Sequence, residues 1–264
     1  MFRSPALTII AGTVLVLGVM IGGLYWISRP TTALELYCAA AMLKPIQIIA
    51  ADYKKETGQE VVLHPGPSQA ILTQLELARD GDLFLPADES YMKQAQDKRL
   101  VTDIKNVADL QAVVIVRPGF DKDIKTFNDF VAVGKRIGMA NPGAAAISSL
   151  TQHELKAQKL WDALAAAGPT YLGDVNEVGN SVVNTGSSDV GITWDALAAA
   201  LVDKKPAVKI VRLKELDSVK ARVQIAVATS TTQREDALRF IAYLRNKDKG
   251  GLQLKKAGYT VAAE

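Results

Sequence analysis

The chain has 264 residues and a formal net charge of only +3, with 22% of its residues charged. This length can bury a sizeable core, either in one large domain or in two lobes. A single cysteine excludes an internal disulfide, and one cysteine with two histidines offers no spacing typical of a zinc site. No basic stretch interleaved with aromatic residues indicates binding to nucleic acid.

The first feature in chain order is an apolar run from Leu7 to Ile27 that contains no charged residue. The run is about long enough to cross the hydrocarbon core of a bilayer, and Arg29 follows it. We therefore expect residues 1–33 to form an N-terminal transmembrane helix that anchors the remainder outside the cytoplasm. A small-x-small pattern at residues 31–33 leaves cleavage as a signal peptide open.

From Leu34 onward, short apolar runs alternate with amphipathic stretches. LELYCA predicts a strand, and LKPIQIIAADYKKETG predicts a helix that ends at Gly58. VVLHP and DLFLPAD predict two more strands, separated by a helix over Ser68–Ala78 with the serine as N-cap, and ESYMKQAQDKRL predicts a third helix. This β-α-β-α-β order predicts a parallel sheet with right-handed crossovers, whose loops gather at the carboxyl ends of the strands.

The second part of the chain continues this alternation with a new set of strands. AVVIVR, RIGMAN, DVGITW, VKIVRL and VQIAVAT each predict a strand. The helices are expected near Thr126–Val133, over Ala146–Ala166 as one long helix, over Glu177–Asn184 and over Glu235–Arg245.

This layout predicts two α/β units joined by two crossing strands, near Val113–Arg117 and near Val223–Ala228. We expect residues 34–113 and 226–264 to form lobe 1, and residues 114–225 to form lobe 2. Such lobes close by hinge motion over a ligand held between them. A two-lobed module outside the cytoplasm is most simply a solute receptor.

Several short motifs follow one another in a fixed order: AAA between a strand and a helix, then ADYKKETGQEVVL, GPSQAILTQLE, DLFLPADESYM, ANPGAAA and DVGITWDA. In combination they resemble the molybdate-binding proteins of ABC transporters, over nearly the whole chain from Leu34 to Tyr259. The resemblance implies an α/β, two-lobed type II periplasmic binding-protein fold. In that fold, two mixed sheets are flanked by helices and joined by two hinge strands.

The resemblance also implies a site that holds a tetrahedral dianion with backbone amides and hydroxyl groups and without counter-charges. The stretch YCAAAMLKP suits such a site, because small side chains let the backbone approach and a helix N-terminus supplies free N–H groups. Carried over position by position, the anion-binding residues are Ala41, Met42, Ser68, Ile147, Asn176 and Trp194. The family's first-loop serine falls on Met42 and its tyrosine on Trp194, whose indole N–H can still donate.

The leading hypothesis is therefore an anchored, extracytoplasmic binding protein that captures molybdate or tungstate and delivers it to an ABC permease and its ATPase. We expect a monomer without a cofactor, without a metal other than the oxyanion, and without a nucleic-acid partner. An enzyme is disfavoured because no P-loop, G-x-G-x-x-G or G-x-S-x-G motif is present.

Two alternatives stay open at this point: a binding protein for sulfate or another small anion, and a membrane-anchored sensory or partner-binding ectodomain. Phosphate is less favoured where the site lacks an acceptor, because protonated phosphate must donate a hydrogen bond. Asp88 and Asp195 lie near predicted loop ends and could supply such an acceptor.

Overall fold

The computed structural model describes residues 32–120, 122–202 and 208–262. The predicted anchor, residues 1–33, lies almost entirely outside these ranges. Within the described ranges, no helix combines the length and the apolar character needed to cross a membrane. Residues 33–264 form one compact unit, and the following description concerns this unit alone.

The first part of the unit is a parallel three-stranded core with helical crossovers. Its strands are β1 (Leu34–Ala39), β2 (Val61–Gly66) and β3 (Leu83–Leu85). Its helices are η1 (Ala40–Met42), α2 (Leu43–Thr57), α3 (Ser68–Ala78) and α4 (Glu89–Asp97). β1 lies between β2 and β3 and is parallel to both. The predicted β-α-β-α-β order and the parallel pairing are confirmed.

The boundaries of α2 follow from its sequence. Ile46, Ile49 and Tyr53 recur on one face and are buried, which is the periodicity of a helix packed against a sheet. The helix ends where Gly58 adopts a φ of 78°, a left-handed conformation that glycine accepts without strain.

Two long antiparallel strands extend this sheet. They are β4 (Val101–Val116) and β9 (Lys220–Ala228). β9 pairs with β3 on one side and with β4 on the other, and β10 (Thr260–Val261) also pairs with β4. The pairing of β4 with β9 stops at Gln111, which lies opposite Lys220. The next segment of β4, Ala112–Val116, pairs with β7 and β8 instead. β4 therefore takes part in both groups of strands.

The second group of strands is also mixed. Its strands are β5 (Ile137–Ala140), β6 (Thr170–Leu172), β7 (Val190–Trp194) and β8 (Lys209–Val211). β5 is parallel to β6 and to β7, while β7 and β8 are antiparallel to β4. The strand order is β2-β1-β3-β9-β4-β7-β5-β6, and β8 and β10 pair with β4 outside this path.

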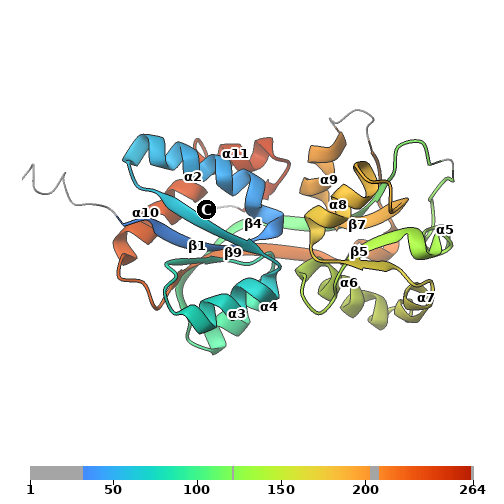
Figure 1. The fold of residues 1–264 in the computed structure, drawn as a ribbon, viewed down its shortest axis with the longest axis horizontal. Helices are drawn as coiled ribbons and strands as arrows, with labels where there is room; N and C mark the ends of the chain where they lie inside the picture. Colours follow the sequence, from blue (N-terminus) through green and yellow to red (C-terminus); the bar gives the residue numbers. More distant parts are fainter. Residues whose placement is uncertain (1–31, 121, 203–207, 263–264) are drawn as a thin grey trace, which may run out of the picture. The chain divides into compact units, whose positions relative to one another are not determined.

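Helices cover both groups of strands (Figure 1). The remaining helices are α5 (Phe127–Val131), η2 (Gly134–Arg136), α6 (Ala146–Ala157), α7 (Trp161–Ala166), α8 (Val175–Val183), α9 (Asp195–Val202), η3 (Lys214–Leu216), α10 (Arg234–Arg245) and α11 (Gly250–Lys256). In the first group, α2 and α11 lie on one face and α3 and α4 on the other; in the second, α8 and α9 lie opposite α6 and α7.

The predicted long helix over Ala146–Ala166 is wrong, because the structure divides it into α6 and α7. Lys159 has a φ of 59°, and the Leu160 N–H donates to Leu155 O at 2.8 Å. This six-to-one bond closes a helix C-terminus, here without the glycine that usually marks one. The break lets Trp161 begin a new helix with its side chain buried.

The passage between the two groups of strands also differs from the prediction. Val223–Ala228 pairs within the first group rather than connecting the groups. The Ala112 N–H donates to Val219 O at 2.9 Å, and Lys220 is the first residue of β9. The chain therefore passes between the groups at Gln111–Ala112 in β4 and just ahead of β9.

Candidate anion-binding site

A small cavity lies where several helices begin. Its open volume is about 20 Å³, counted as space for the centre of a water-sized sphere. Its lining includes the starts of η1, α3, α6 and α8, together with Ala87 after β3 and Trp194 at the end of β7. The predicted gathering of loops at strand ends therefore produces one shared cavity, which we call the small cavity.

The helix starts supply donors at this cavity. Ser68 is the first residue of α3, Ile147 the second of α6 and Val175 the first of α8. The first N–H groups of a helix have no acceptor within that helix, and their partial positive charge attracts an anion. Convergent helix N-termini form a ready anion site without cationic side chains.

Ser68 is 2% exposed, but it is not the N-cap that the sequence predicted. Pro67 holds the N-cap position, and no side chain caps α3. Instead, Ser68 Oγ accepts a hydrogen bond from the Ala87 N–H at 3.1 Å. A hydroxyl group can accept and donate at once, so this bond fixes the oxygen and leaves its proton for an acceptor in the cavity.

The carbonyl oxygens of Ala40 and Ala41, directly after β1, already accept hydrogen bonds within the protein. Asn176 Nδ2 donates to Ala40 O at 2.9 Å, and the Tyr259 hydroxyl donates to Ala41 O. A carbonyl oxygen would repel an anion, so partners that hold these oxygens help to reserve the N–H groups for the cavity.

The structure brings four of the six predicted residues to the small cavity. These are Ala41, Ser68, Ile147 and Trp194. Trp194 is fully buried as the last residue of β7. Met42 is also fully buried, and it is not among the residues that line the cavity.

Asn176, predicted as an anion-binding residue, does not line the small cavity, and its backbone N–H is already engaged. Asp174 caps α8, and its Oδ1 accepts from the N–H of Asn176 at 2.7 Å and of Glu177 at 3.1 Å. Val175, one residue earlier, lines the small cavity instead. The one-residue difference arises because a side-chain cap uses the second and third N–H groups of the helix.

Asp174 also lines the small cavity, and sequence reasoning missed it. Among the described residues it is the one charged residue in the lining, where no lysine, arginine or histidine is found. Its Oδ1 is held by the N–H groups of Asn176 and Glu177 at the start of α8. An Asx cap before VNEVGN is a sequence signal that could have located it.

Hydrogen bonds cross the site from one group of strands to the other. The Gln69 N–H at the start of α3 donates to Ala144 O ahead of α6 at 3.2 Å. The bond from Asn176 to Ala40 also links α8 to η1. These contacts hold the elements around the small cavity together in the described arrangement.

Burial raises the pKa of two titratable groups next to residues that line the small cavity, Cys38 and Asp88. Burial raises the pKa of the Cys38 thiol, so the thiolate needed for reactivity is disfavoured. Burial also raises the pKa of Asp88, although hydrogen bonds from Ser90 and Tyr91 act against this. Asp88 Oδ2 is buried without a hydrogen-bond partner among the described residues.

We expect the substitution Asp88→Asn to stabilise the protein at neutral pH. A carboxyl with a raised pKa in the folded state holds its proton longer than in the unfolded chain, so stability falls as pH rises from the unfolded pKa through the folded one. Asparagine can still cap α4 through its oxygen and removes the buried charge, for an expected gain on the order of 1 kcal/mol.

Chemical denaturation at pH 4 and pH 7.5 measures this effect, with Asp97→Asn at the exposed end of α4 as the matched control. The expected gain should be larger at pH 7.5 than at pH 4 for Asp88→Asn only. Equal gains at both pH values would contradict a buried, charged Asp88.

Among the described residues, no group of three or more His, Cys, Asp or Glu side chains could hold a metal ion.

Most of the chain matches one known protein family. Residues 34–260 match the model of the bacterial extracellular solute-binding proteins. The chain belongs to this family. Its members bind substrates for transport and are not enzymes, and membership implies a location outside the cytoplasm.

Individual relatives of this solute-binding protein include oxyanion-binding proteins. It is 25% identical to the molybdate-binding protein ModA of Escherichia coli (strain K12) over 238 residues, which cover 86% of this chain and 89% of that protein. The periplasmic molybdate-binding protein of Azotobacter vinelandii has a similar fold, with a TM-score of 0.72 and 18% identity over 87% of this chain and 100% of that chain.

The sulfate-binding protein SubI of Mycobacterium tuberculosis H37Rv is similar to the same degree. Its TM-score is 0.73 at 16% identity, and the match covers 86% of each chain. The two-lobed α/β periplasmic binding fold predicted for this solute-binding protein is thereby confirmed. At 16–18% sequence identity, structural similarity shows the fold alone. The ligand has to be argued from the chemistry of the site.

Proposed function

We propose that this solute-binding protein captures a tetrahedral oxyanion, molybdate or tungstate, in the small cavity and delivers it to an ABC permease and its ATPase. The observation that carries the proposal is the convergence of the starts of η1, α3, α6 and α8 on one cavity without a cationic side chain. A fully deprotonated oxyanion offers only acceptors, and these helix starts offer donors.

The donors we propose are the backbone N–H groups of Ala41, Ser68, Ile147 and Val175, with the Ser68 hydroxyl and the Trp194 indole; Met42 does not line the cavity and is left out. Ser68 and Trp194 are both buried against the cavity. Hydrogen bonds to a charged acceptor are worth more when water is excluded, because the effective dielectric constant is lower.

Sulfate is the second candidate, and the size of the cavity favours it. The open volume of about 20 Å³ is close to the minimum for a single water molecule, and sulfate is the smaller of these tetrahedral dianions. Replacement of the family's serine by Met42 and of its tyrosine by Trp194 also separates this site from the family's molybdate pattern.

Asp174 bears on a third anion. Its carboxylate is an acceptor at the cavity, and hydrogen phosphate must donate one hydrogen bond. The preference is tested by calorimetric titration of the full chain with molybdate, tungstate, sulfate and phosphate. Tight binding of the first two supports the proposal, tight binding of sulfate alone supports the second candidate, and no binding of any oxyanion refutes both.

We expect Ser68→Ala to weaken molybdate binding about ten- to a hundredfold, the usual value of one hydrogen bond to a charged partner. The matched control is Ser90→Ala, which removes a hydroxyl from the first turn of α4, outside the small cavity. Calorimetry on both variants decides the point. Equal affinities for Ser68→Ala and the unchanged chain would show that this hydroxyl does not contact the anion.

We also propose that each group of strands, with the helices that cover it, forms one lobe, and that residues 1–33 anchor a monomer in the membrane. The apolar run from Leu7 to Ile27 motivates the anchor. Intact-mass measurement of the protein from its native membrane tests it, since a mature chain that starts near Leu34 would refute an uncleaved anchor.

A further inference from the structure

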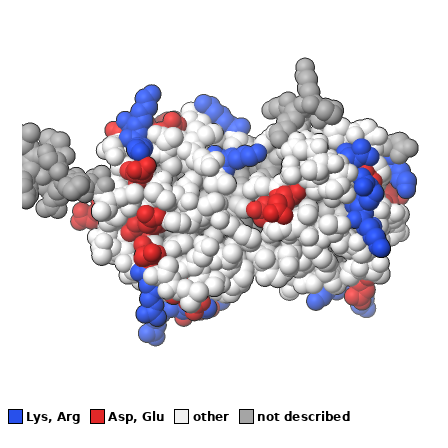
Figure 2. Space-filling model, viewed as in Figure 1, with Lys and Arg blue, Asp and Glu red and all other residues white. Residues whose placement is uncertain are grey.

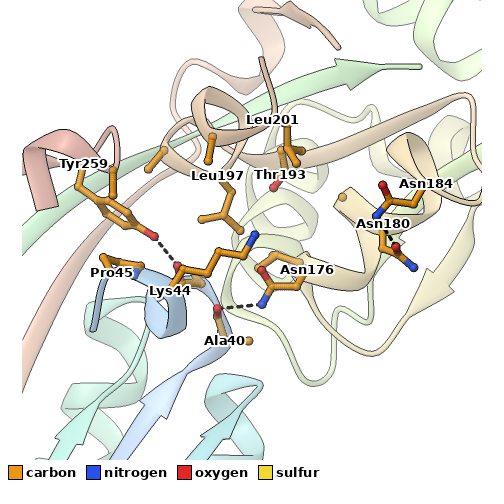
Figure 3. Close-up of a pocket in the computed structure, with 16 residues that line it drawn as sticks. Ala40, Lys44, Pro45, Asn176, Asn180, Asn184, Thr193, Leu197, Leu201 and Tyr259 are labelled. Atoms are coloured by element: carbon orange, nitrogen blue, oxygen red, sulfur yellow. Dashed lines mark hydrogen bonds between the residues drawn. The ribbon is translucent and has the colours of Figure 1, made fainter. Parts of the chain in front are cut away.

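A second cavity also borders η1, with an open volume of about 260 Å³. We call it the large cavity. The first turn of α2, helices α8 and α9, and the tail residues Ala257 and Tyr259 form its walls (Figure 3). It shares Ala40, Ala41 and Val175 with the small cavity. It is more than ten times as large, so it can accept a ligand of a different kind.

Lys44, an exposed residue, carries the only charge among the described residues that line the large cavity. No aspartate or glutamate lines it, and Lys44 forms no ion pair with any residue in the described ranges. Figure 3 shows its side chain extending across the space toward Asn176. An ammonium group without a counter-charge at a partly enclosed site favours an anionic ligand. On the face drawn in Figure 2, by comparison, basic and acidic side chains are interspersed.

Thr193 supplies an independent indication of a ligand. It is fully buried in β7, and its Oγ1 has no hydrogen-bond partner among the described residues. Buried hydroxyl groups are nearly always paired, because an unpaired one destabilises the folded state. Thr193 lines the large cavity, and Figure 3 shows its oxygen on the side that faces the cavity. A ligand with a polar atom can provide the missing partner.

The remaining walls are mostly apolar. Leu197 and Leu201 of α9 lie opposite Pro45 of α2 around the open space. An apolar pocket with a few convergent polar groups is the usual form of a site for a small organic molecule. An inorganic oxyanion would satisfy Lys44 but would leave these apolar walls uncovered.

We propose that the large cavity is a second ligand site that takes a small organic carboxylate. The carboxylate group meets Lys44 Nζ, the apolar body packs on Leu197 and Leu201, and a polar atom reaches Thr193. Ala41 and Val175 line both cavities, but the contacts proposed for the carboxylate are made by Lys44, Leu197, Leu201 and Thr193, which are not donors to the oxyanion. The proposal therefore stands independently of the anion in the small cavity.

Titration calorimetry of the full chain with benzoate and hexanoate tests the proposal, and benzamide serves as the uncharged match of benzoate. We expect dissociation constants near 1 mM or below for the carboxylates and weaker binding of benzamide. Lys44→Met should weaken benzoate binding by about tenfold, the usual effect of losing a charged hydrogen-bond partner. Lys55→Met, which removes an exposed lysine elsewhere on α2, should leave it unchanged.

Thr193→Val keeps the shape of the side chain and removes the unpaired hydroxyl. We expect this variant to be at least as thermally stable as the unchanged chain without ligand, and to bind the carboxylates more weakly. The proposal is overturned if neither carboxylate binds by about 10 mM, or if Lys44→Met and Lys55→Met behave alike.

Competition separates the two cavities. Benzoate that still binds in the presence of saturating molybdate supports a second site, whereas displacement by molybdate would place benzoate in the small cavity and refute the proposal. If molybdate itself does not bind, the comparison of Lys44→Met with Lys55→Met still decides whether the large cavity takes a carboxylate.

Discussion

Ala41→Asp should abolish molybdate binding at the small cavity. Ala41 is 5% exposed and lines this cavity, so a carboxylate there would stand beside the bound dianion. Two like unit charges about 4 Å apart near a protein surface repel by about 4 kcal/mol, which corresponds to roughly a thousandfold in affinity. Calorimetry with molybdate and sulfate should therefore detect no binding in the range where the unchanged chain binds.

The matched control is Ala41→Asn, because an asparagine side chain has nearly the same size as an aspartate side chain and carries no charge. We expect Ala41→Asn to weaken binding less than Ala41→Asp, because its amide can still donate to an oxyanion. Equal losses in the two variants would attribute the effect to crowding of the cavity rather than to charge. Unchanged affinity in Ala41→Asp, with thermal unfolding as the check on folding, would place the anion elsewhere.

Gly250→Ala should produce the largest loss of stability among single methyl additions in the described part of the chain. A Cβ atom at residue 250 would lie 2.5 Å from Leu244 Cα and 2.7 Å from its carbonyl carbon. Backbone atoms cannot move aside as a side chain can, so α11 would have to shift away from the end of α10. We expect a loss of about 3 kcal/mol, the upper end for over-packing, measured by urea denaturation.

Gly179→Ala is the control with the opposite sign. The nearest atom to a Cβ there is Leu201 Cδ1 at 3.4 Å, the end of a flexible side chain. Glycine within a helix costs about 0.5–1 kcal/mol relative to alanine, and residue 179 lies inside α8. We therefore expect Gly179→Ala to be neutral or stabilising, and a similar loss in both variants would contradict the crowding argument.

Much of the local structure was predictable because it depends on neighbouring residues. The burial of Ile46, Ile49 and Tyr53 on one face of α2 and the turn at Gly58 follow from periodicity and from the conformational freedom of glycine. The break at Lys159 was not predictable in this way, because a left-handed residue other than glycine leaves no compositional signal.

Part of the site was predictable for a similar reason. Ser68 and Ile147 lie at helix starts that follow strands, and the carboxyl ends of parallel strands meet at one edge of a sheet. That Asp174 and Val175 line the small cavity while Asn176 does not follows from the capping bonds to the N–H groups of Asn176 and Glu177, which the sequence pattern did not locate to the residue.

By itself, the sequence determined the alternation of strands and helices, the parallel core around β1 and the small, uncharged side chains of Ala39–Ala41, since each depends on residue type and short spacing. Only the tertiary structure decided that β4 takes part in both groups of strands, that Asn176 holds Ala40 O and that Lys44 and Thr193 line one cavity. Lys44 and Thr193 are far apart in the sequence, and no local preference encodes which distant residues meet. Their meeting depends on how the whole chain packs.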